Sequence, residues 1–400
     1  MIDRMKVLSF SHFVQGPAAS QYLADLGADV VKVEPTTGSW ERRIGSAGIR
    51  FRDRSVTFLS VNRHKRSLAV DLKHPRAVEA LRPLIASVDV VMENYRGGAL
   101  DRLGLGYDAV REIRPDVIYA SASGWGSRGP MADRPGVDLL VQARSGLAAA
   151  TGDLDRPRAA GTPVVDHHGA ALLAMGVLAA YARRLVTGEG TRVEASLLGA
   201  GLDLQAESLA LYLADGRTSD DLERPDELAC WSIDAPYGTY RLADAAVAIA
   251  ISGPMDALAD VLDVPALAAF DEAARRRDPV TYTRLLADAL AGRTYADVAA
   301  RLERGGLWFE RVAGYDDVVA DPQVVAEGLL GAVEVDGAET TVLRHPVRYD
   351  GELPAVRRNP PELGEHTREV LSDVGLSDEQ IDDLVRDGVV AAHEGVPVGR

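Results

Sequence analysis

The segment GTPVVDHHGAALLAMGVLAAYARRLVT, residues 161–187, joins a short apolar approach, one carboxylate and a long run of small and apolar residues. The run predicts a helix of about twenty residues, roughly 30 Å long, that begins at Asp166. Two roles are open to this carboxylate. As an N-cap it would accept a backbone N–H, which is worth about 1 kcal/mol. Held at the positive end of a helix, it would stay ionised and could attack an activated acyl group.

Small residues recur along this predicted helix and would let other backbones approach it closely, so we expect a buried central helix. They are Ala170, Ala171, Ala174, Gly176, Ala179, Ala180 and Ala182. The flanking chain alternates between strand-like and helical segments, with strands predicted over residues 7–10, 29–34, 67–71, 88–92, 117–121 and 192–196. Such units imply a parallel sheet. We therefore predict an α/β fold with a doubly wound layer, whose ligands bind at the carboxyl ends of the strands.

Polar residues follow these strands, and each of them alone would be an ordinary loop residue. They are His12 and Gln15, then Arg42 and Arg43, Lys73, the run Asn94, Tyr95 and Arg96, and finally 124–126. Because parallel strands end at one edge of a sheet, their convergence predicts a phosphate-bearing ligand. The first turn carries Gln15-Gly16-Pro17 and lacks GxGxxG, which argues against a nicotinamide-dependent dehydrogenase.

The length of 400 residues exceeds what one hydrophobic core usually supports. We assign residues 1–205 to a large domain and the charged, breaker-rich segment 206–230 to a linker. Residues 231–325 form a small α/β domain that opens with a hairpin over 237–251. Residues 326–400 return to the large domain through strands near 340–348 and end in a helix after the capping box Ser377–Gln380.

The composition restricts the partners. With 60 acidic against 44 basic residues the net charge is −16, which argues against non-specific binding to nucleic acid or to an anionic membrane. An anionic ligand must then meet a local basic cluster. Cys230 is the single cysteine and the eight histidines show no HExxH spacing, so no metal site is predicted. No uninterrupted run of 18 apolar residues and no signal peptide is evident, and we predict a cytoplasmic protein.

Seven segments together resemble the class III CoA-transferases, the family of formyl-CoA:oxalate and carnitine CoA-transferases, which is related to the α-methylacyl-CoA racemases. The segments are 7–17, 23–35, 62–73, 93–104, 123–126, 161–189 and 360–371. The resemblance implies a large Rossmann-like domain built from both chain ends, a smaller α/β domain and an interlocked homodimer. It also implies acyl-CoA as substrate and no tightly bound cofactor.

The resemblance assigns roles to residues. Asp166 stands at the family's nucleophilic aspartate. The positions that hold CoA in the family correspond to Val14, Gln15, Val70, Lys73, Asn94, Tyr95, Arg96, Arg102 and the loop 135–138 with Val137 and Asp138. His12 and Arg43 complete the predicted CoA site. Arg42 or Arg43 is expected to replace a nucleotide-binding basic residue of the family, because Pro35 stands at its position.

Two further departures bear on the reaction. The glycine-rich lid of the oxalate enzyme has no counterpart after Cys230. The racemases carry a histidine near position 137, where this chain has Val137, and two-base proton exchange is hard to run without it. We therefore expect CoA transfer through an aspartyl anhydride and an aspartyl-CoA thioester. The oxyanions would be stabilised by backbone N–H groups after Asp166 and near Gln15, and the CoA phosphates by Lys73, Arg96 and Arg102.

Three questions stay open at this level. An acyl-CoA racemase or epimerase, and a catalytically silent CoA-binding protein, are the alternative functions. For His167 and His168, either one packs or bonds to the backbone and the other is incidental, or one of them binds the acceptor carboxylate. The sequence does not identify the donor and acceptor acids.

Overall fold

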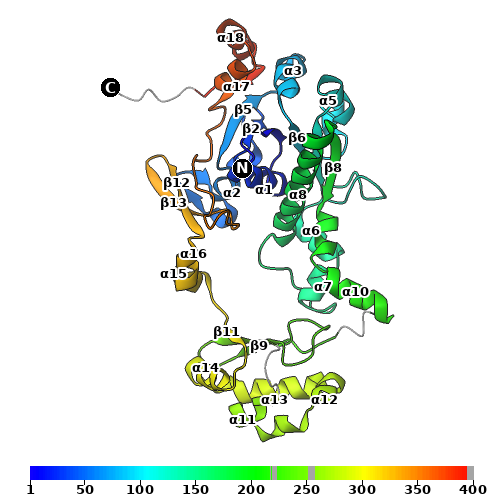
Figure 1. Ribbon diagram of the computed structural model, residues 1–400, viewed down its shortest axis with the longest axis vertical. Helices are drawn as coiled ribbons and strands as arrows, with labels where there is room; N and C mark the ends of the chain where they lie inside the picture. The colour runs from blue at the N-terminus through cyan, green and yellow to red at the C-terminus, as the bar shows by residue number, and fades with distance from the viewer. Residues whose placement is uncertain (217, 219–222, 251–256, 394–400) are drawn as a thin grey trace. The chain divides into compact units, whose positions relative to one another are not determined.

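The computed structural model describes residues 1–216, 218, 223–250 and 257–393. The chain divides into two compact units. Unit 1 comprises Met1–Val141, Thr162–Leu204 and the chain from Gln323 onward, and unit 2 comprises Gln142–Gly161 and Gln205–Pro322. The predicted α/β class is confirmed, since unit 1 is built on a large parallel sheet (Figure 1).

In the described part of the chain this sheet has seven strands in the order β14-β5-β2-β1-β6-β7-β8. All neighbours are parallel except β14, which runs antiparallel to β5. The strands are β1 (Lys6–Phe10), β2 (Asp29–Glu34), β5 (Lys65–Val70), β6 (Val90–Glu93), β7 (Ile118–Ser123), β8 (Thr191–Ser196) and β14 (Val390–Ala391).

The order reverses between β1 and β6. From β1 the chain adds β2 and β5 on one side, then returns to add β6, β7 and β8 on the other. Phe10, the last residue of β1, lies opposite Glu93, the last residue of β6. Such a switch point opens a crevice at the carboxyl ends of the two strands, which is where ligands of doubly wound sheets bind.

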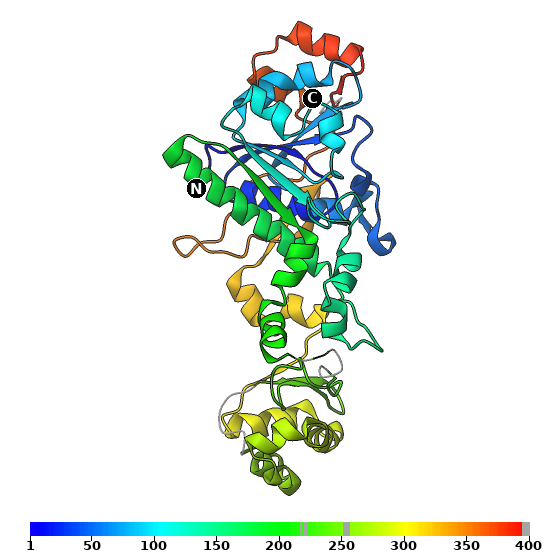
Figure 2. The ribbon, with the colours of Figure 1, turned by 90° about the vertical axis from the view of Figure 1, so that its right-hand side faces the viewer.

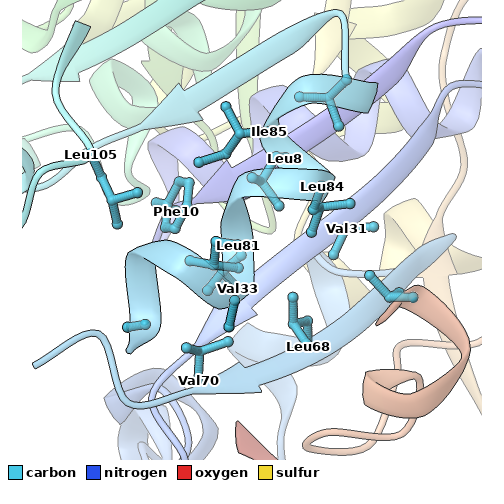
Figure 3. Packing of buried hydrophobic residues seen from close by; sticks show 14 of the residues in the cluster. Leu8, Phe10, Val31, Val33, Leu68, Val70, Leu81, Leu84, Ile85 and Leu105 are labelled. Atoms are coloured by element: carbon cyan, nitrogen blue, oxygen red, sulfur yellow. The ribbon is translucent and has the colours of Figure 1, made fainter. Parts of the chain in front are cut away.

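Side chains alternate between the two faces of the sheet along each strand. Buried apolar side chains lie on both faces, and helices cover each face. Leu8, Val31 and Leu68 pack on one face with Leu81 and Ile85, which belong to helix α3 (Ala77–Ser87) (Figure 3). That layer also contains α5 (Tyr107–Ile113), α17 (Thr367–Asp373) and α18 (Asp378–Arg386). The opposite face packs against α1 (Gln15–Asp25) and α8 (Val164–Thr187).

Shorter elements complete unit 1. They are η1 (Trp40–Arg42), η2 (Ser46–Gly48), β3 (Arg50–Phe51), β4 (Arg54–Ser55), α2 (Val56–Ser60), α4 (Ala99–Arg102), α6 (Asp138–Arg144), α9 (Leu197–Asp203), α16 (Pro322–Glu327), β12 (Leu330–Val335) and β13 (Ala338–Leu343). The strand predicted near 340–348 is β13, which pairs with β12 in a separate two-stranded sheet. The C-terminal return to the main sheet is made by β14.

Unit 2 has its own core around Tyr240, Tyr282 and Leu286. Its elements are α7 (Leu147–Thr151), α10 (Ala206–Asp215), β9 (Gly238–Arg241), β10 (Ala246–Ile249), α11 (Ala257–Leu262), η4 (Pro265–Ala269), α12 (Glu272–Arg277), α13 (Pro279–Ala291), α14 (Tyr295–Arg304), β11 (Phe309–Arg311) and α15 (Tyr315–Ala320). The predicted hairpin is β9–β10, and its last predicted residue, Ile251, lies outside the described residues. The segment predicted as linker begins with helix α10, whose apolar residues the charged neighbours concealed.

Helix α8 differs from the buried central helix that was predicted. It lies along the sheet beside β8 (Figure 2) and buries only one face, through Ala170, Leu173 and Val177. On its other face Leu185 is 70% and Val186 87% exposed. By length and hydropathy this helix could span a membrane, a test that the core helix of a soluble protein also passes.

Candidate functional site

The carboxyl ends of β1 and β6 are joined by the predicted residues His12 and Asn94. The His12 backbone N–H donates to Asn94 Oδ1 at 2.9 Å, and Asn94 Nδ2 donates to the His12 carbonyl at 2.8 Å. The rings of His12 and Tyr95 meet edge to face, 5.2 Å between centroids. The Asn94 side-chain amide therefore links the chain after β1 to the chain after β6, and its hydrogen-bonding groups are used by the His12 backbone.

Gln15 is the first residue of α1 and reaches helix α8. Its Nε2 is buried and has no hydrogen-bond partner among the described residues. A Cβ on Gly169 would lie only 2.7 Å from this nitrogen, so glycine at that position admits the amide. Gly169 follows Asp166 by three residues, which places the Gln15 amide about one helical turn from the predicted nucleophile.

Asp166 is the third residue of α8 and is 3% exposed. The helix begins two residues earlier, with Pro163 in the N-cap position. Within the described residues, the Asp166 Oδ2 atom is buried without a hydrogen-bond partner. The N-cap interpretation of this carboxylate is therefore wrong, because its side chain caps no backbone group.

The capping role belongs to Asp138, the first residue of α6. Its Oδ2 accepts from the backbone N–H of Val165 at 2.8 Å and from that of Asp166 at 3.0 Å. The next N–H, of His167, donates to the Pro163 carbonyl at 3.2 Å. Of the N–H groups after Asp166 that are predicted to stabilise an oxyanion, the first already has an acceptor, and that role stays a prediction.

The protonation of Asp166 also differs from the prediction. Burial, together with the nearby negative charge of Asp138, raises the pKa of Asp166 to about 7. The carboxyl group is therefore about half ionised at neutral pH, where the position at a helix start predicted full ionisation. Burial lowers the pKa of His12, so this imidazole is mostly neutral at pH 7.

The two histidines beside the nucleophile face different surroundings. His168 Nε2 lies 2.7 Å from Asp203 Oδ2, at the end of α9. His167 is exposed. Of the two, His168 has a structural partner, which favours the interpretation of that residue as a packing neighbour.

The basic residues divide into two groups. Arg42 donates twice to Glu34, at 2.7 Å each, and its guanidinium lies 3.8 Å from the centre of the Phe58 ring. These contacts give Arg42 a structural role. Of the two arginines, Arg43 is the exposed one. The predicted CoA-binding residues among the exposed basic side chains are Arg43, Lys73 and Arg96, in the loops after β2, β5 and β6, and Arg102, at the end of α4.

Glu34 ends β2, where dinucleotide-binding folds place the carboxylate that binds a ribose. Here it accepts from Ser39 and Ser67 in addition to Arg42. Burial would raise its pKa, but Arg42 and Lys32 outweigh that effect and lower the pKa to about 2. This carboxylate joins β2 to its neighbours, in agreement with the missing GxGxxG.

The other residues predicted to bind CoA are Val14, Val70 and Val137, and each lies at the end of a strand or next to the start of a helix. Val14 precedes α1 and is buried, and Val70 ends β5 and is buried. Val137 is 47% exposed and precedes Asp138. In the ranges that the structure describes, no group of three or more His, Cys, Asp or Glu side chains could hold a metal ion.

A cavity of about 390 Å³ lies at the carboxyl ends of β6, β7 and β8 and was missed from sequence. Glu93, Tyr107, Tyr119 and Arg192 are among its lining residues, with the predicted Tyr95 and Arg96. Burial raises the pKa of Glu93 to about 7. A charged residue that closes a buried strand is the sequence signal that could have identified Glu93.

The sequence profile of CoA-transferase family III matches residues 2–367 of the chain. The chain belongs to CoA-transferase family III. A succinyl-CoA:glutarate CoA-transferase of Mus musculus is 32% identical over 98% of this chain and 91% of its own. A probable fatty acyl-CoA transferase of Mycobacterium tuberculosis is 32% identical over 93% of this chain and 97% of its own.

Solved structures agree with this assignment. A CaiB/BaiF family protein from Brucella suis superposes with a TM-score of 0.80 at 30% identity, covering 93% of this chain and 99% of that one. The family III chain described here is therefore an enzyme of the class III CoA-transferase type, and its large parallel sheet is that of the CaiB/BaiF structures.

Proposed function

We propose that this enzyme moves CoA from an acyl-CoA donor to a free carboxylic acid, with Asp166 as a covalent nucleophile. One observation carries the proposal: a buried carboxylate oxygen and a buried amide nitrogen, both without partners among the described residues, belong to helices that pack together at the switch point. Unsatisfied buried polar groups of this kind are costly and are typical of functional sites.

The proposed first half-reaction has two steps. An Asp166 oxygen attacks the donor thioester carbonyl, the carbon–sulfur bond breaks, and CoA thiolate leaves an aspartyl mixed anhydride. The thiolate then attacks the aspartyl carbonyl, the anhydride carbon–oxygen bond breaks, and the donor acid departs from an aspartyl-CoA thioester. The acceptor carboxylate runs these steps in reverse and restores the Asp166 carboxylate.

The Gln15 amide is the proposed oxyanion donor. Its Nε2 protons are uncommitted within the described residues, unlike the N–H groups at the start of α8. The first-turn N–H groups of α1 lie at the same end of the sheet and add positive potential there. Attack requires the ionised form of Asp166, which is present in about half of the molecules near pH 7.

CoA is proposed to occupy the switch-point crevice, against His12, Val14, Gln15, Val70, Asn94, Tyr95, Val137 and Asp138. Its phosphates would meet Arg43, Lys73, Arg96 and Arg102, which are exposed side chains in the chain segments that follow β2, β5 and β6. A protein of net charge −16 needs such a local cluster to bind an anion. No tightly bound cofactor is required by this chemistry.

The relatives that act on dicarboxylic acids suggest the substrate class. Succinyl-CoA:glutarate CoA-transferase is named for a dicarboxylic donor and a dicarboxylic acceptor. We propose substrates of that class for this chain. A screen of succinyl-, acetyl-, oxalyl- and aromatic acyl-CoA donors against dicarboxylic and monocarboxylic acceptors tests it.

A homodimer is the proposed assembly, and the interlocked arrangement belongs to this proposal. Its support in unit 1 is the exposed apolar surface of α8 and α9, which includes Met175, Leu185, Val186 and Leu202. Exposed apolar patches on a monomer mark interaction surfaces. A cytoplasmic location without nucleic-acid or membrane partners stays a prediction from the sequence.

The covalent step has a direct test. Enzyme is incubated with acyl-CoA and hydroxylamine and then digested, and the peptide with residue 166 is searched for a hydroxamate by mass spectrometry. Asp203, an exposed aspartate in α9, is the internal control and should stay unmodified. Turnover without modification of Asp166 would exclude the covalent route. Solvent deuterium at the α-carbon of a 2-methylacyl-CoA without an acceptor acid would favour a racemase instead.

A further inference from the structure

Two buried lysines contact the turn that carries Gln15, and neither has a part in the chemistry above. Lys32 lies in β2 and Lys65 in β5, and both are 0% exposed. Lysine is rarely buried completely unless its ammonium group is well paired. The hydrogen-bond acceptors of the two ammonium groups therefore show which part of the backbone Lys32 and Lys65 stabilise.

The two ammonium groups bind opposite ends of the Ser11–Pro17 turn. Lys32 Nζ donates to the Ser11 carbonyl at 2.6 Å and lies 3.2 Å from Glu41 Oε1. Lys65 Nζ donates to the Pro17 carbonyl at 2.7 Å. One charged group thus holds the residue that leaves β1, and the other holds the first turn of α1.

Lys65 is also fixed on its other side. Its Nζ donates to the Val61 carbonyl and to Asn62 Oδ1, both at 2.8 Å. Burial lowers the pKa of Lys65, but three oxygen acceptors match the three protons of an ammonium group, and a neutral amine has only two. Hydrogen bonds from a charged donor are roughly twice as strong as neutral ones.

The turn needs such anchors because of its backbone. Phe13 has a φ of 65°, in the left-handed region that is uncommon for a residue with a side chain. Residues held there persist only where the surroundings determine the conformation. The Asn94 amide holds His12 beside it, and the lysines hold the two ends.

We infer that Lys32 and Lys65 are positioning residues that hold the two ends of the Ser11–Pro17 turn and thereby keep the Gln15 amide against helix α8. The inference rests on the proposed role of Gln15 in CoA transfer. It assigns the lysines no contact with substrate. Their effect on the rate must therefore act through Gln15.

A double-mutant cycle on kcat tests this coupling. The variants are Lys65→Met, Gln15→Ala and the double variant, with Lys32→Met in a parallel cycle. We expect Lys65→Met to lower kcat about ten-fold when Gln15 is present and less than about two-fold when it is absent. Arg66→Met is the matched control, because Arg66 neighbours Lys65 but pairs with Asp29, Glu369 and Asp373. It should leave kcat unchanged.

The turn itself supplies a second measurement. Hydrogen exchange at the amides of residues 12–16 should accelerate in Lys65→Met and Lys32→Met and stay unchanged in Arg66→Met. Lys65→Gln, which keeps a donor, replaces Lys65→Met if that variant does not fold. If Gln15→Ala keeps full activity, the proposed role of Gln15 fails, and the exchange measurement still decides the anchoring. Multiplicative rate effects in the double variant, or unchanged exchange in both lysine variants, would overturn the inference.

Discussion

Asparagine at position 166 has nearly the shape of a protonated aspartate but cannot ionise, so it isolates the cost of the buried charge. The folded state holds a proton on Asp166 up to a pKa of about 7, whereas the usual value is 3.8. Between these two pH values the folded protein binds more protons than the unfolded chain. The free energy of unfolding of the wild type therefore falls as the pH rises through this window, and that of Asp166→Asn lacks this fall.

The magnitude follows from the two pKa values. A difference of about 3 corresponds to about 4 kcal/mol, because one pKa unit is worth about 1.4 kcal/mol. From pH 5 to pH 8 about two-thirds of this range is crossed, so Asp166→Asn should gain about 3 kcal/mol relative to the wild type. With an unfolding entropy of about 2.1 cal/mol/K per residue, that gain corresponds to roughly 4–6 °C in the melting temperature, the lower value for the 400-residue chain and the higher for unit 1 alone.

Differential scanning calorimetry at the two pH values measures the effect. Any constant cost of burying an asparagine amide cancels, because only the change between the two pH values is compared. Asp138→Asn removes the negative charge that is the smaller of the two causes of the raised pKa of Asp166, and its side-chain oxygen can still accept from the backbone N–H groups. In this variant the free energy of unfolding should therefore depend less on pH than in the wild type. Asp108→Asn, at an exposed position in α5, controls for the lost charge.

The result that would refute this reasoning is a stability difference between Asp166→Asn and wild type that is the same at both pH values. It would mean that the folded protein ionises Asp166 as easily as the unfolded chain does. The nucleophile would then be fully ionised at neutral pH, and burial would impose no cost on it.

Three further outcomes are expected. The value of kcat/KM for the acyl-CoA donor should rise with pH to a plateau, with a midpoint at about 7, because only ionised Asp166 attacks; a profile that is flat from about pH 5 upward would contradict this. Gly169→Ala should lower kcat about ten-fold or more, because the new Cβ displaces the Gln15 amide. The melting temperature should not fall, because alanine favours the helix. A further fall in kcat when Gly169→Ala is added to Gln15→Ala would count against this explanation. His168→Ala should leave the acceptor KM unchanged and cost less than about 1 kcal/mol of stability, since its carboxylate partner is largely exposed; steady-state kinetics and urea unfolding measure both.

Local sequence patterns were enough to predict most secondary-structure elements of the large parallel sheet. The β-branched run Asp29–Glu34 is β2 with the predicted bounds, and the helix predicted after the capping box Ser377–Gln380 is α18. These segments are defined by periodicity and by flanking Gly and Pro residues, which act over a few residues. Their alternation also predicted a parallel sheet and the edge at which His12, Asn94 and Tyr95 meet. The order of family segments indicated the CoA-transferases.

The chemistry of the site depended on contacts between residues far apart in the chain. Asp138 caps α8 from 27 residues before Val165, and its charge moves the pKa of Asp166. The Gln15 amide reaches Gly169 only because α1 and α8 pack on the same face of the sheet. Neither neighbour is visible in a local pattern, so the sequence suggested an N-cap or a fully ionised carboxylate, whereas the folded protein holds a half-ionised one that caps no backbone group.

One physical reason separates what the sequence predicted from what depended on the tertiary structure. A hydrophobic period or a turn residue acts through the backbone around it, so the sequence alone determined the strands, the helices and their alternation. Hydrogen-bond partners and pKa values depend on which groups share a water-excluded volume, and only the packing of the sheet against its helices decided that. The capped start of α8, the half-ionised Asp166 and the contacts of the buried lysines with the Ser11–Pro17 turn are therefore properties of the tertiary structure.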